Sequence, residues 1–190
     1  MRTTSGANRN YRQMGFSLIE VMLTVGIVGV SLASALPSLT TTFERQRLRS
    51  AANSIVNHVY LARSEAISLR QPVSISFDSN AWCVGVTTAQ NCDCTVTDPS
   101  AATACVLPAG NGLRLSRYSS DQHPGVSIAL SGFNAASATT FEPIRGGTTA
   151  GSINLTGSNG EQLRATVNRL GRVALCTPGA AAVPGGYSTC

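Results

Sequence analysis

The feature that most constrains this chain is an apolar run that follows a glycine-phenylalanine pair. Residues 16–39 read FSLIEVMLTVGIVGVSLASALPSL and hold a single charged residue, Glu20. As a helix this run would extend about 36 Å at about 1.5 Å per residue, which is enough to cross a hydrocarbon core of about 30 Å. The run therefore predicts a transmembrane helix with one acidic side chain near its start.

The segment before the run is short and basic. Residues 1–15 hold Arg2, Arg9 and Arg12 and no acidic residue. A short basic flank keeps that end of the chain in the cytoplasm. These arginines also supply much of the net charge of +5, because the remaining chain holds 11 basic residues (14 − 3) against 9 acidic ones. A general polyanion-binding surface is therefore not implied, although a local patch stays open.

Three explanations of the apolar run are possible, and they differ in whether Glu20 has a partner for its charge. An ordinary secretory signal peptide would use the small residues at 33–35, yet the run exceeds the usual 7–15 residues of its apolar region. A simple membrane anchor leaves Glu20 unpaired, at a cost of about 2.5–3.5 kcal/mol. Cleavage between Gly15 and Phe16 would create an α-amino group at Phe16. In a bundle of such helices, that amine can meet the Glu20 carboxylate of a neighbouring subunit.

The stretch GFSLIEVMLTVGIVGV closely resembles the class III signal of type IV pilins and type II secretion pseudopilins. The resemblance implies that prepilin peptidase cuts after Gly15 and methylates the amine of Phe16. It also implies that Phe16 and Glu20 act in assembly. Gly29 and Pro37 fall where many members of that superfamily have residues that loosen the helix.

The segment that follows, residues 40–71, predicts an amphipathic helix that stops before Pro72. Its apolar residues recur at alternating steps of four and three: Leu48, Ala52, Ile55, Val59, Ala62, Ala66 and Leu69. This stripe is expected to cover a sheet. The arginines that lie off the stripe are interpreted as a solvated surface: Arg45, Arg49, Arg63 and Arg70.

From Val73 the apolar period changes to two, which predicts strands. VSISF and WCVGV flank a turn at residues 78–80 and predict a hairpin. Six further strand-like segments follow between turn-rich stretches: GLRLSRY, VSIAL, TTFEPI, SINLTG, QLRATVN and RVALC. The predicted fold is α+β and type IV pilin-like, with a long N-terminal helix packed on an antiparallel β-sheet domain. The chain then divides into a leader at 1–15, an assembly helix at 16–39, the amphipathic helix, and a β domain at 72–190.

An even number of cysteines lies in loop-like sequence after an export-type segment, which favours disulfides formed in an oxidising compartment. They are Cys83, Cys92, Cys94, Cys105, Cys176 and Cys190. Zinc held by the first four is disfavoured, since no paired C-x2-C spacing is present. A Cys176–Cys190 bridge would close a tail rich in Ala, Gly and Pro. The pairing of the other four stays open.

The stretch FEPIRGGTTAGSINLTGSNGEQLRATVNRLGRVALC looks like the C-terminal part of the GspH/FimT pseudopilin domain, the family that includes FimU-like minor pilins. The resemblance implies a minor pilin or pseudopilin that is inserted in the inner membrane with its C-terminal domain in the periplasm. Prepilin peptidase would process it, and other major and minor subunits would be its partners. It would prime assembly of a type IV pilus or pseudopilus or form part of the tip. A minor pseudopilin of a type II secretion system is an alternative, and the sequence hardly distinguishes it from a minor pilin of a type IV pilus.

No catalytic constellation is evident, and no enzyme activity, cofactor or metal is expected. His58 falls on the predicted amphipathic helix, and His123 precedes a proline in a turn. Neither has a nucleophile or a paired acid that the sequence places beside it.

The last candidate site is Gly171-Arg172 in the segment NRLGRVALC. Competence-type members of the family resemble DNA receptors that carry Gly-Arg-x-Arg near the C-terminus, and two such arginines can contact successive phosphates. Here Ala174 replaces the second arginine, so Arg164 and Arg169 are the candidates to complete a DNA-binding patch for natural transformation. The favoured alternative is that Gly171 provides a positive φ in a hairpin turn and Arg172 is only solvated.

Overall fold

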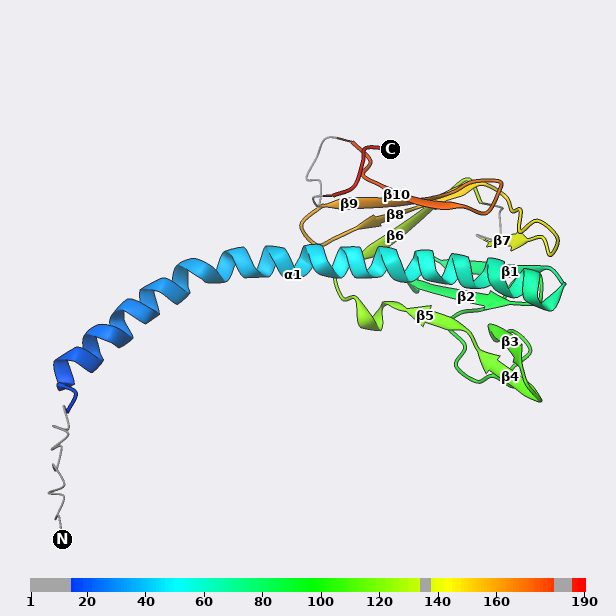
Figure 1. The fold of residues 1–190 in the computed structure, drawn as a ribbon. Helices are drawn as coiled ribbons and strands as arrows, with labels where there is room; N and C mark the ends of the chain where they lie inside the picture. The colour runs from blue at the N-terminus through cyan, green and yellow to red at the C-terminus, as the bar shows by residue number, and fades with distance from the viewer. Residues whose placement is uncertain (1–14, 134–137, 180–185) are drawn as a thin grey trace, which may run out of the picture. The chain divides into compact units, whose positions relative to one another are not determined.

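The computed structural model describes residues 15–133, 138–179 and 186–190, and for 34–39 it describes the backbone alone. The described α-helix, α1 Leu18–Leu69, continues from the apolar run into the amphipathic segment without a break (Figure 1). It ends before Pro72, as predicted. The chain divides into one unit up to Thr40 and a compact unit from Thr41 to Cys190. The predicted leader lies outside the described residues except for Gly15.

Two four-stranded antiparallel sheets form most of the compact unit. The first has the order β5-β2-β1-β7 and consists of β1 Val73–Asp78, β2 Cys83–Thr87, β5 Arg117–Ser119 and β7 Ala138–Phe141. The second has the order β10-β9-β8-β6 and consists of β6 Ser127–Ser131, β8 Gly151–Thr156, β9 Gln162–Val167 and β10 Val173–Cys176. A separate hairpin and a single 3-10 turn complete the described part: β3 Val106–Ala109, β4 Gly112–Leu115 and η1 Ser120–Gln122.

The core lies between the amphipathic half of α1 and both sheets. The predicted stripe is confirmed, because Leu48, Ile55 and Val59 are at most 1% exposed. Its alanines are fully buried, and Leu69 at its end is partly buried against the core. Val73, Ile75 and Phe77 alternate along β1 toward this core, and Ile153 and Leu155 do the same along β8. One apolar face of each sheet thus packs on one stripe of the helix, which confirms the predicted α+β class.

The arginines of α1 are not merely solvated, and that interpretation was wrong for three of them. The Nε atom of Arg49 is buried. The Arg45 Nε atom donates to Glu161 Oε1 at 2.7 Å, and Glu161 is buried in the turn between β8 and β9. The Arg63 Nε atom is buried without a hydrogen-bond partner among the described residues. Arg45 and Arg63 therefore help to join the helix to loops of the second sheet.

The strand predictions differ from the structure in three places, and the smallest difference is that the last three residues of TTFEPI lie beyond β7. GLRLSRY was expected to form one strand, but it divides at Ser116 into β4 and β5, which belong to different sheets. Strand β3 was not predicted, because it directly follows the cysteine-rich insert at residues 88–105, whose sequence is typical of irregular structure. The bend at Ser116 has a clear cause: its N–H donates to Cys105 C=O and its own C=O accepts from Val86 N–H.

Candidate functional site

The first candidate site is the start of α1. Phe16 precedes the helix and is 83% exposed. The Ser17 carbonyl accepts hydrogen bonds from the backbone N–H groups of Glu20, at 3.0 Å, and Val21, at 3.2 Å, so the helix begins at this serine. Glu20 lies in the first turn, where the helix dipole favours a negative charge. Its exposed carboxylate makes no hydrogen bond or ion pair within the described residues.

An apolar surface continues from this point along the helix. Large apolar side chains at eleven described positions are about half or more exposed: Phe16, Leu18, Ile19, Val21, Met22, Leu23, Val25, Ile27, Val28, Val30 and Leu32. They occur at successive positions, so they surround the helix instead of forming a stripe. A helix that is apolar on all sides needs a cover in its working environment.

The helix passes through Gly29 and Pro37 without interruption. An added side chain at Gly29 would meet only open space. Within the described residues, no helical segment is long and apolar enough to cross a membrane. The predicted span of residues 16–39 includes 34–39, whose side chains lie outside the described residues, and it stays a prediction. The processing and assembly roles of Gly15, Phe16 and Glu20 also stay predictions.

The second candidate site is the turn between β9 and β10, at residues 168–172. The Asn168 carboxamide oxygen accepts from the backbone N–H groups of Leu170 and Arg172, each at 3.0 Å. The Asn168 N–H donates to Arg172 C=O at 3.0 Å, and the Gly171 N–H donates to Asn168 C=O at 2.9 Å. Gly171 has φ +69°, a left-handed conformation that glycine adopts without steric cost. The turn thus has its own structural need for a glycine at this position.

Gly171 is also buried against a second loop, which connects β7 to β8. A Cβ atom at Gly171 would collide with the carbonyl oxygen of Gly146 and lie 3.1 Å from Phe141 Cε1 and 3.3 Å from Arg63 Cδ. Gly146 has φ +61°, and a Cβ there would lie 2.6 Å from Arg63 Nε. The stem of Arg63 therefore fits between two glycines, so the close approach of the two loops explains both.

The three candidate DNA-contacting arginines are not brought together. Arg169 and Arg172 are exposed in the turn, but Arg164 lies opposite Cys176 and donates from Nε to Asn154 Oδ1 at 2.6 Å. Arg164 is four residues from Asn168, a separation of about 13 Å along the strand. The structure instead brings exposed Arg145 near the turn, because its neighbour Gly146 contacts Gly171. Arg145 was not predicted as part of this patch, although the Gly-Gly pair that follows it was an available signal.

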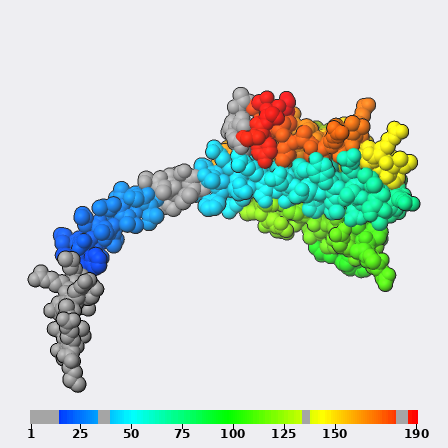
Figure 2. Space-filling model, in the orientation of Figure 1, coloured from blue at the N-terminus to red at the C-terminus, as the bar shows by residue number. Residues whose placement is uncertain are grey.

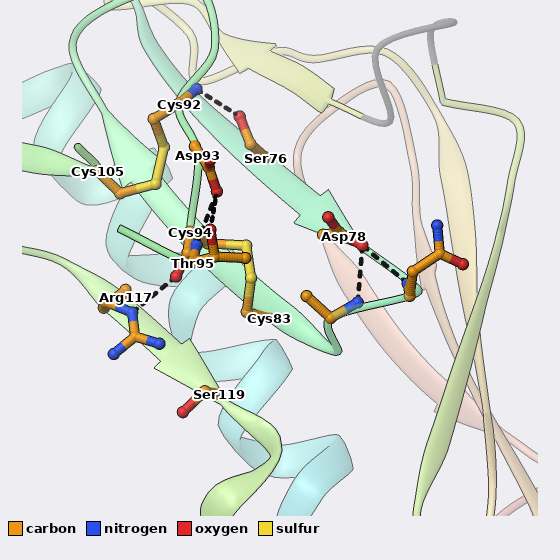
Figure 3. The surroundings of a disulfide bond; sticks show 12 residues. Ser76, Asp78, Cys83, Cys92, Asp93, Cys94, Thr95, Cys105, Arg117 and Ser119 are labelled. Atoms are coloured by element: carbon orange, nitrogen blue, oxygen red, sulfur yellow. Dashed lines mark hydrogen bonds between the residues drawn. A yellow bond between two sulfur atoms is a disulfide. The ribbon is translucent and has the colours of Figure 1, made fainter. Parts of the chain in front are cut away.

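Disulfide bonds, expected from the sequence, are confirmed, and no cysteine is free. The bridges join Cys83 to Cys94, Cys92 to Cys105, and Cys176 to Cys190. The first two fasten the insert over the outer face of β1 and β2 (Figure 3), where Cys92 N–H donates to Ser76 Oγ at 3.1 Å and Arg117 Nε donates to Cys94 C=O at 2.7 Å. Gly85 leaves the space for this arrangement, since a Cβ there would overlap the Cys105 sulfur.

The two histidines belong to an aromatic cluster. The rings of His58 and His123 lie 5.2 Å and 5.7 Å from the ring of Tyr118, measured between centroids, and Trp82 packs on the same tyrosine at 5.7 Å. Burial lowers the pKa of His123 from its ordinary value and raises the pKa of Tyr118. This packing gives both histidines a structural role.

The family assignment rests on a match over most of the compact unit. The model of the family described as type II transport protein GspH matches residues 51–171, which run from the buried stripe of α1 to the β9–β10 turn. The chain belongs to the GspH family. It is thus a minor pilin or pseudopilin of the GspH/FimT type, as the sequence resemblance implied. Family members assemble with other pilins or pseudopilins, and the family is not known for enzymes.

Solved structures of low sequence identity also match about 70% of this chain. The minor pseudopilin EpsH of the Vibrio cholerae type 2 secretion system is 16% identical, with a TM-score of 0.48 over 70% of this chain and 99% of EpsH. The Pseudomonas aeruginosa type IV minor pilin FimU is 18% identical, with a TM-score of 0.47 over 70% of this chain and 90% of FimU. Escherichia coli GspH is 17% identical, with a TM-score of 0.47 over 70% of this chain and 89% of that protein. No curated protein sequence matches the chain.

Proposed function

We propose that this member of the GspH family is cleaved by prepilin peptidase between Gly15 and Phe16 and then built into a type IV pilus or pseudopilus. Before assembly, residues 16–39 anchor it in the inner membrane, with the N-terminal side in the cytoplasm and the C-terminal domain in the periplasm. In the filament it primes assembly or forms part of the tip. N-methylation of Phe16 accompanies the cleavage.

The apolar surface of residues 16–32 carries this proposal. Burying one large apolar side chain is worth about 1.5–3 kcal/mol, so a helix with eleven such side chains exposed gains greatly from any apolar surrounding. Lipid provides one such surrounding, and a bundle of similar helices provides another. Transfer from the first to the second keeps the apolar surface covered at both stages.

Glu20 provides the specificity that apolar packing lacks. Lipid offers this carboxylate no partner, whereas the new amine of Phe16 on an adjacent subunit would neutralise it. The pairing works only between staggered helices, because the amine and carboxylate of one helix are a turn apart. It would therefore set the register between subunits.

The test is the Glu20→Ala variant in the full-length chain. We expect normal cleavage, seen as the normal shift in size on an immunoblot, together with at least a tenfold loss of the protein from the sheared filament fraction. Glu44→Ala, which removes an acid from the same helix within the compact unit, is the matched control and should be incorporated normally. Normal incorporation of Glu20→Ala would refute the docking mechanism.

N-terminal sequencing of the mature protein tests the cleavage step separately. We expect a first residue of Phe16 carrying one additional methyl group. A first residue of Leu36 would instead show an ordinary signal peptidase site after the small residues at 33–35. The neighbouring genes distinguish the two kinds of assembly, since genes for minor pilins and a pilus adhesin indicate a pilus and a secretion operon indicates a pseudopilus.

DNA uptake is a second candidate, and the exposure of Arg145, Arg169 and Arg172 around one turn favours it. Three cations are few for DNA binding, so the affinity for duplex DNA would be low and strongly dependent on salt. Binding of duplex DNA to the unit from Thr41 to Cys190 across a salt series, with Arg172→Ala and Arg164→Ala beside it, tests this. If Arg172→Ala loses DNA binding and Arg164→Ala keeps it, the patch is supported. If the unsubstituted unit does not bind duplex DNA at low salt, the patch is excluded.

A further inference from the structure

The β3–β4 hairpin lies outside both four-stranded sheets and protrudes from the compact unit (green in Figure 2). Its two strands pair from Val106 with Leu115 to Ala109 with Gly112, and Gly110 and Asn111 form the connection. Gly110 has φ +55°, which fits the first central position of a type II′ turn. The hairpin is thus a regular two-stranded element with a tight end.

Three contacts hold the hairpin to the domain. The Cys92–Cys105 bridge fixes the residue directly before β3, and Leu107 is fully buried in the main core. On β4, Arg114 Nη2 lies 3.1 Å from Glu65 Oε1 on α1. A partner that binds the hairpin would therefore meet a pre-ordered surface and would not bear the entropy cost of ordering it.

The outer face of the hairpin is apolar. Cross-strand pairs share a face, so Val106, Pro108, Leu113 and Leu115 lie together on the side opposite Leu107 and Arg114. Leu113 is 60% exposed and Pro108 is also exposed. A solvated hairpin ordinarily turns polar side chains outward, so an apolar outer face indicates an interaction surface.

The two edges of the hairpin differ. Hydrogen-bonded and non-hydrogen-bonded pairs alternate along an antiparallel ladder, and the bond from Ser116 N–H to Cys105 C=O shows which pairs are which. Residues 107 and 114 therefore bond to each other. The backbone groups of 106, 108, 113 and 115 point outward. Proline at 108 removes one outward N–H from β3 and so protects that edge. On β4 the outward N–H and C=O groups of Leu113 and Leu115 have no partner in the part of the chain that the structure describes. Of the two hairpin strands, β4 is thus the one that keeps both of its outward N–H groups for pairing with another strand.

We propose that the β4 edge docks an extended segment of a neighbouring subunit whose side chains alternate apolar, acidic, apolar. The unpaired backbone groups require a strand, and the apolar outer face selects apolar side chains beside Leu113 and Leu115. Between them lies Arg114, whose side chain is 52% exposed and contacts one oxygen of Glu65. A second copy paired symmetrically about residue 114 would place Arg114 opposite Arg114, which like charges disfavour, whereas an acidic residue there is attracted. The identity of the partner as a subunit rests on the proposed function; the docking edge does not.

The test uses the full-length chain in detergent micelles and two blocked synthetic peptides. One alternates valine and glutamate, and the other alternates valine and lysine. We expect the glutamate peptide at millimolar concentration to shift the NMR amide signals of Leu113 and Leu115 and to slow their hydrogen exchange. The lysine peptide should bind about tenfold more weakly, because a favourable cross-strand charge pair becomes an unfavourable one. Arg114→Glu should reverse this preference.

A matched pair of variants isolates the backbone edge. Leu113→Pro removes the outward N–H without touching the bonds between β3 and β4, and it mirrors Pro108 on the opposite strand. Leu113→Val keeps that N–H. We expect peptide binding to be lost in Leu113→Pro and kept in Leu113→Val, with the melting temperature of both near that of the parent. Unchanged amides at Leu113 and Leu115, or equal binding of both peptides, would overturn the proposal. Since these measurements need no filament, their failure is distinct from a failure of the Glu20 experiment.

Discussion

The interpretation of Gly171 as a structural glycine makes a quantitative prediction for Gly171→Ala. Placing alanine in the left-handed region costs about 1–2 kcal/mol. The new methyl group would also press on the Gly146 carbonyl, Phe141 and Arg63, and such overpacking typically costs about 1–3 kcal/mol. The free energy of unfolding of the compact unit should therefore fall by about 2–5 kcal/mol.

Gly160 provides the matched control. It lies in the turn between β8 and β9 with φ +78°, but a Cβ atom there would have no neighbour within 4 Å. Gly160→Ala should thus cost only the backbone component, about 1–2 kcal/mol. Any gain from restricting the unfolded chain is common to both variants and cancels in the difference.

Urea unfolding at neutral pH with the disulfides intact measures both variants on the unit from Thr41 to Cys190. The midpoint should move to lower urea in both, by clearly more in Gly171→Ala, with an unchanged dependence on urea concentration. In thermal unfolding, each kcal/mol corresponds to about 2–4 °C for a unit of this size. If the two variants lose equal stability, the packing of the two loops around Gly171 is not what requires the glycine, and the reasoning fails.

Three further predictions concern the insert, the aromatic cluster and the ion pair of the helix. Gly85→Ala should prevent complete closure of the Cys92–Cys105 bridge, because the added Cβ atom would overlap the Cys105 sulfur. Thiol alkylation followed by mass spectrometry should then find about two free thiols per affected molecule. The control Gly112→Ala, whose site is open, should show none. Because burial lowers the pKa of His123, the unfolded state binds more protons than the folded state at acidic pH. The free energy of unfolding should therefore fall as the pH drops below about 6.5. In His123→Phe this dependence of the unfolding free energy on pH should be weaker. Glu161→Gln should lower stability by about 1–3 kcal/mol through the loss of its charge-assisted bond to Arg45, and Glu142→Gln, at an exposed site, should stay within about 0.5 kcal/mol.

The amphipathic helix and most strands could be predicted because their signals are local. The stripe from Leu48 to Leu69 repeats at helical spacing, and β1 and β2 alternate at spacing two around a turn. Strand β3 escaped prediction because it follows Cys105, whose disulfide partner the sequence left open, and because the sequence does not show that Leu107 reaches the core. The division at Ser116 escaped for a similar reason, since it depends on bonds to Cys105 and Val86 from distant parts of the sequence.

The same difference between local signals and contacts of distant residues applies to the candidate sites. Residues whose proposed role depends on spacing within one helix, such as Phe16 and Glu20, could be named from the sequence. The arginine cluster could not be assembled correctly, because the order of residues along the chain does not show how far each side chain lies from the β9–β10 turn. Arg164 lies on the strand before the turn but too far from it, opposite Cys176. Arg145 comes from another loop, which the packing of Gly146 on Gly171 brings near the turn.

The connectivity of the insert has a consequence for the biogenesis of the protein. The order of cysteines along the chain makes the Cys83–Cys94 and Cys92–Cys105 bridges overlap, whereas pairing neighbours in sequence would give two separate loops of similar length. Loop-closure entropy changes by only about 0.6 kcal/mol for each doubling of length, so the chain itself hardly prefers either arrangement. The overlapping pair is selected by the folded β1–β2 hairpin and by the space above Gly85. Oxidation must therefore follow strand pairing, and a chain oxidised too early would need thiol–disulfide exchange to recover the native bridges.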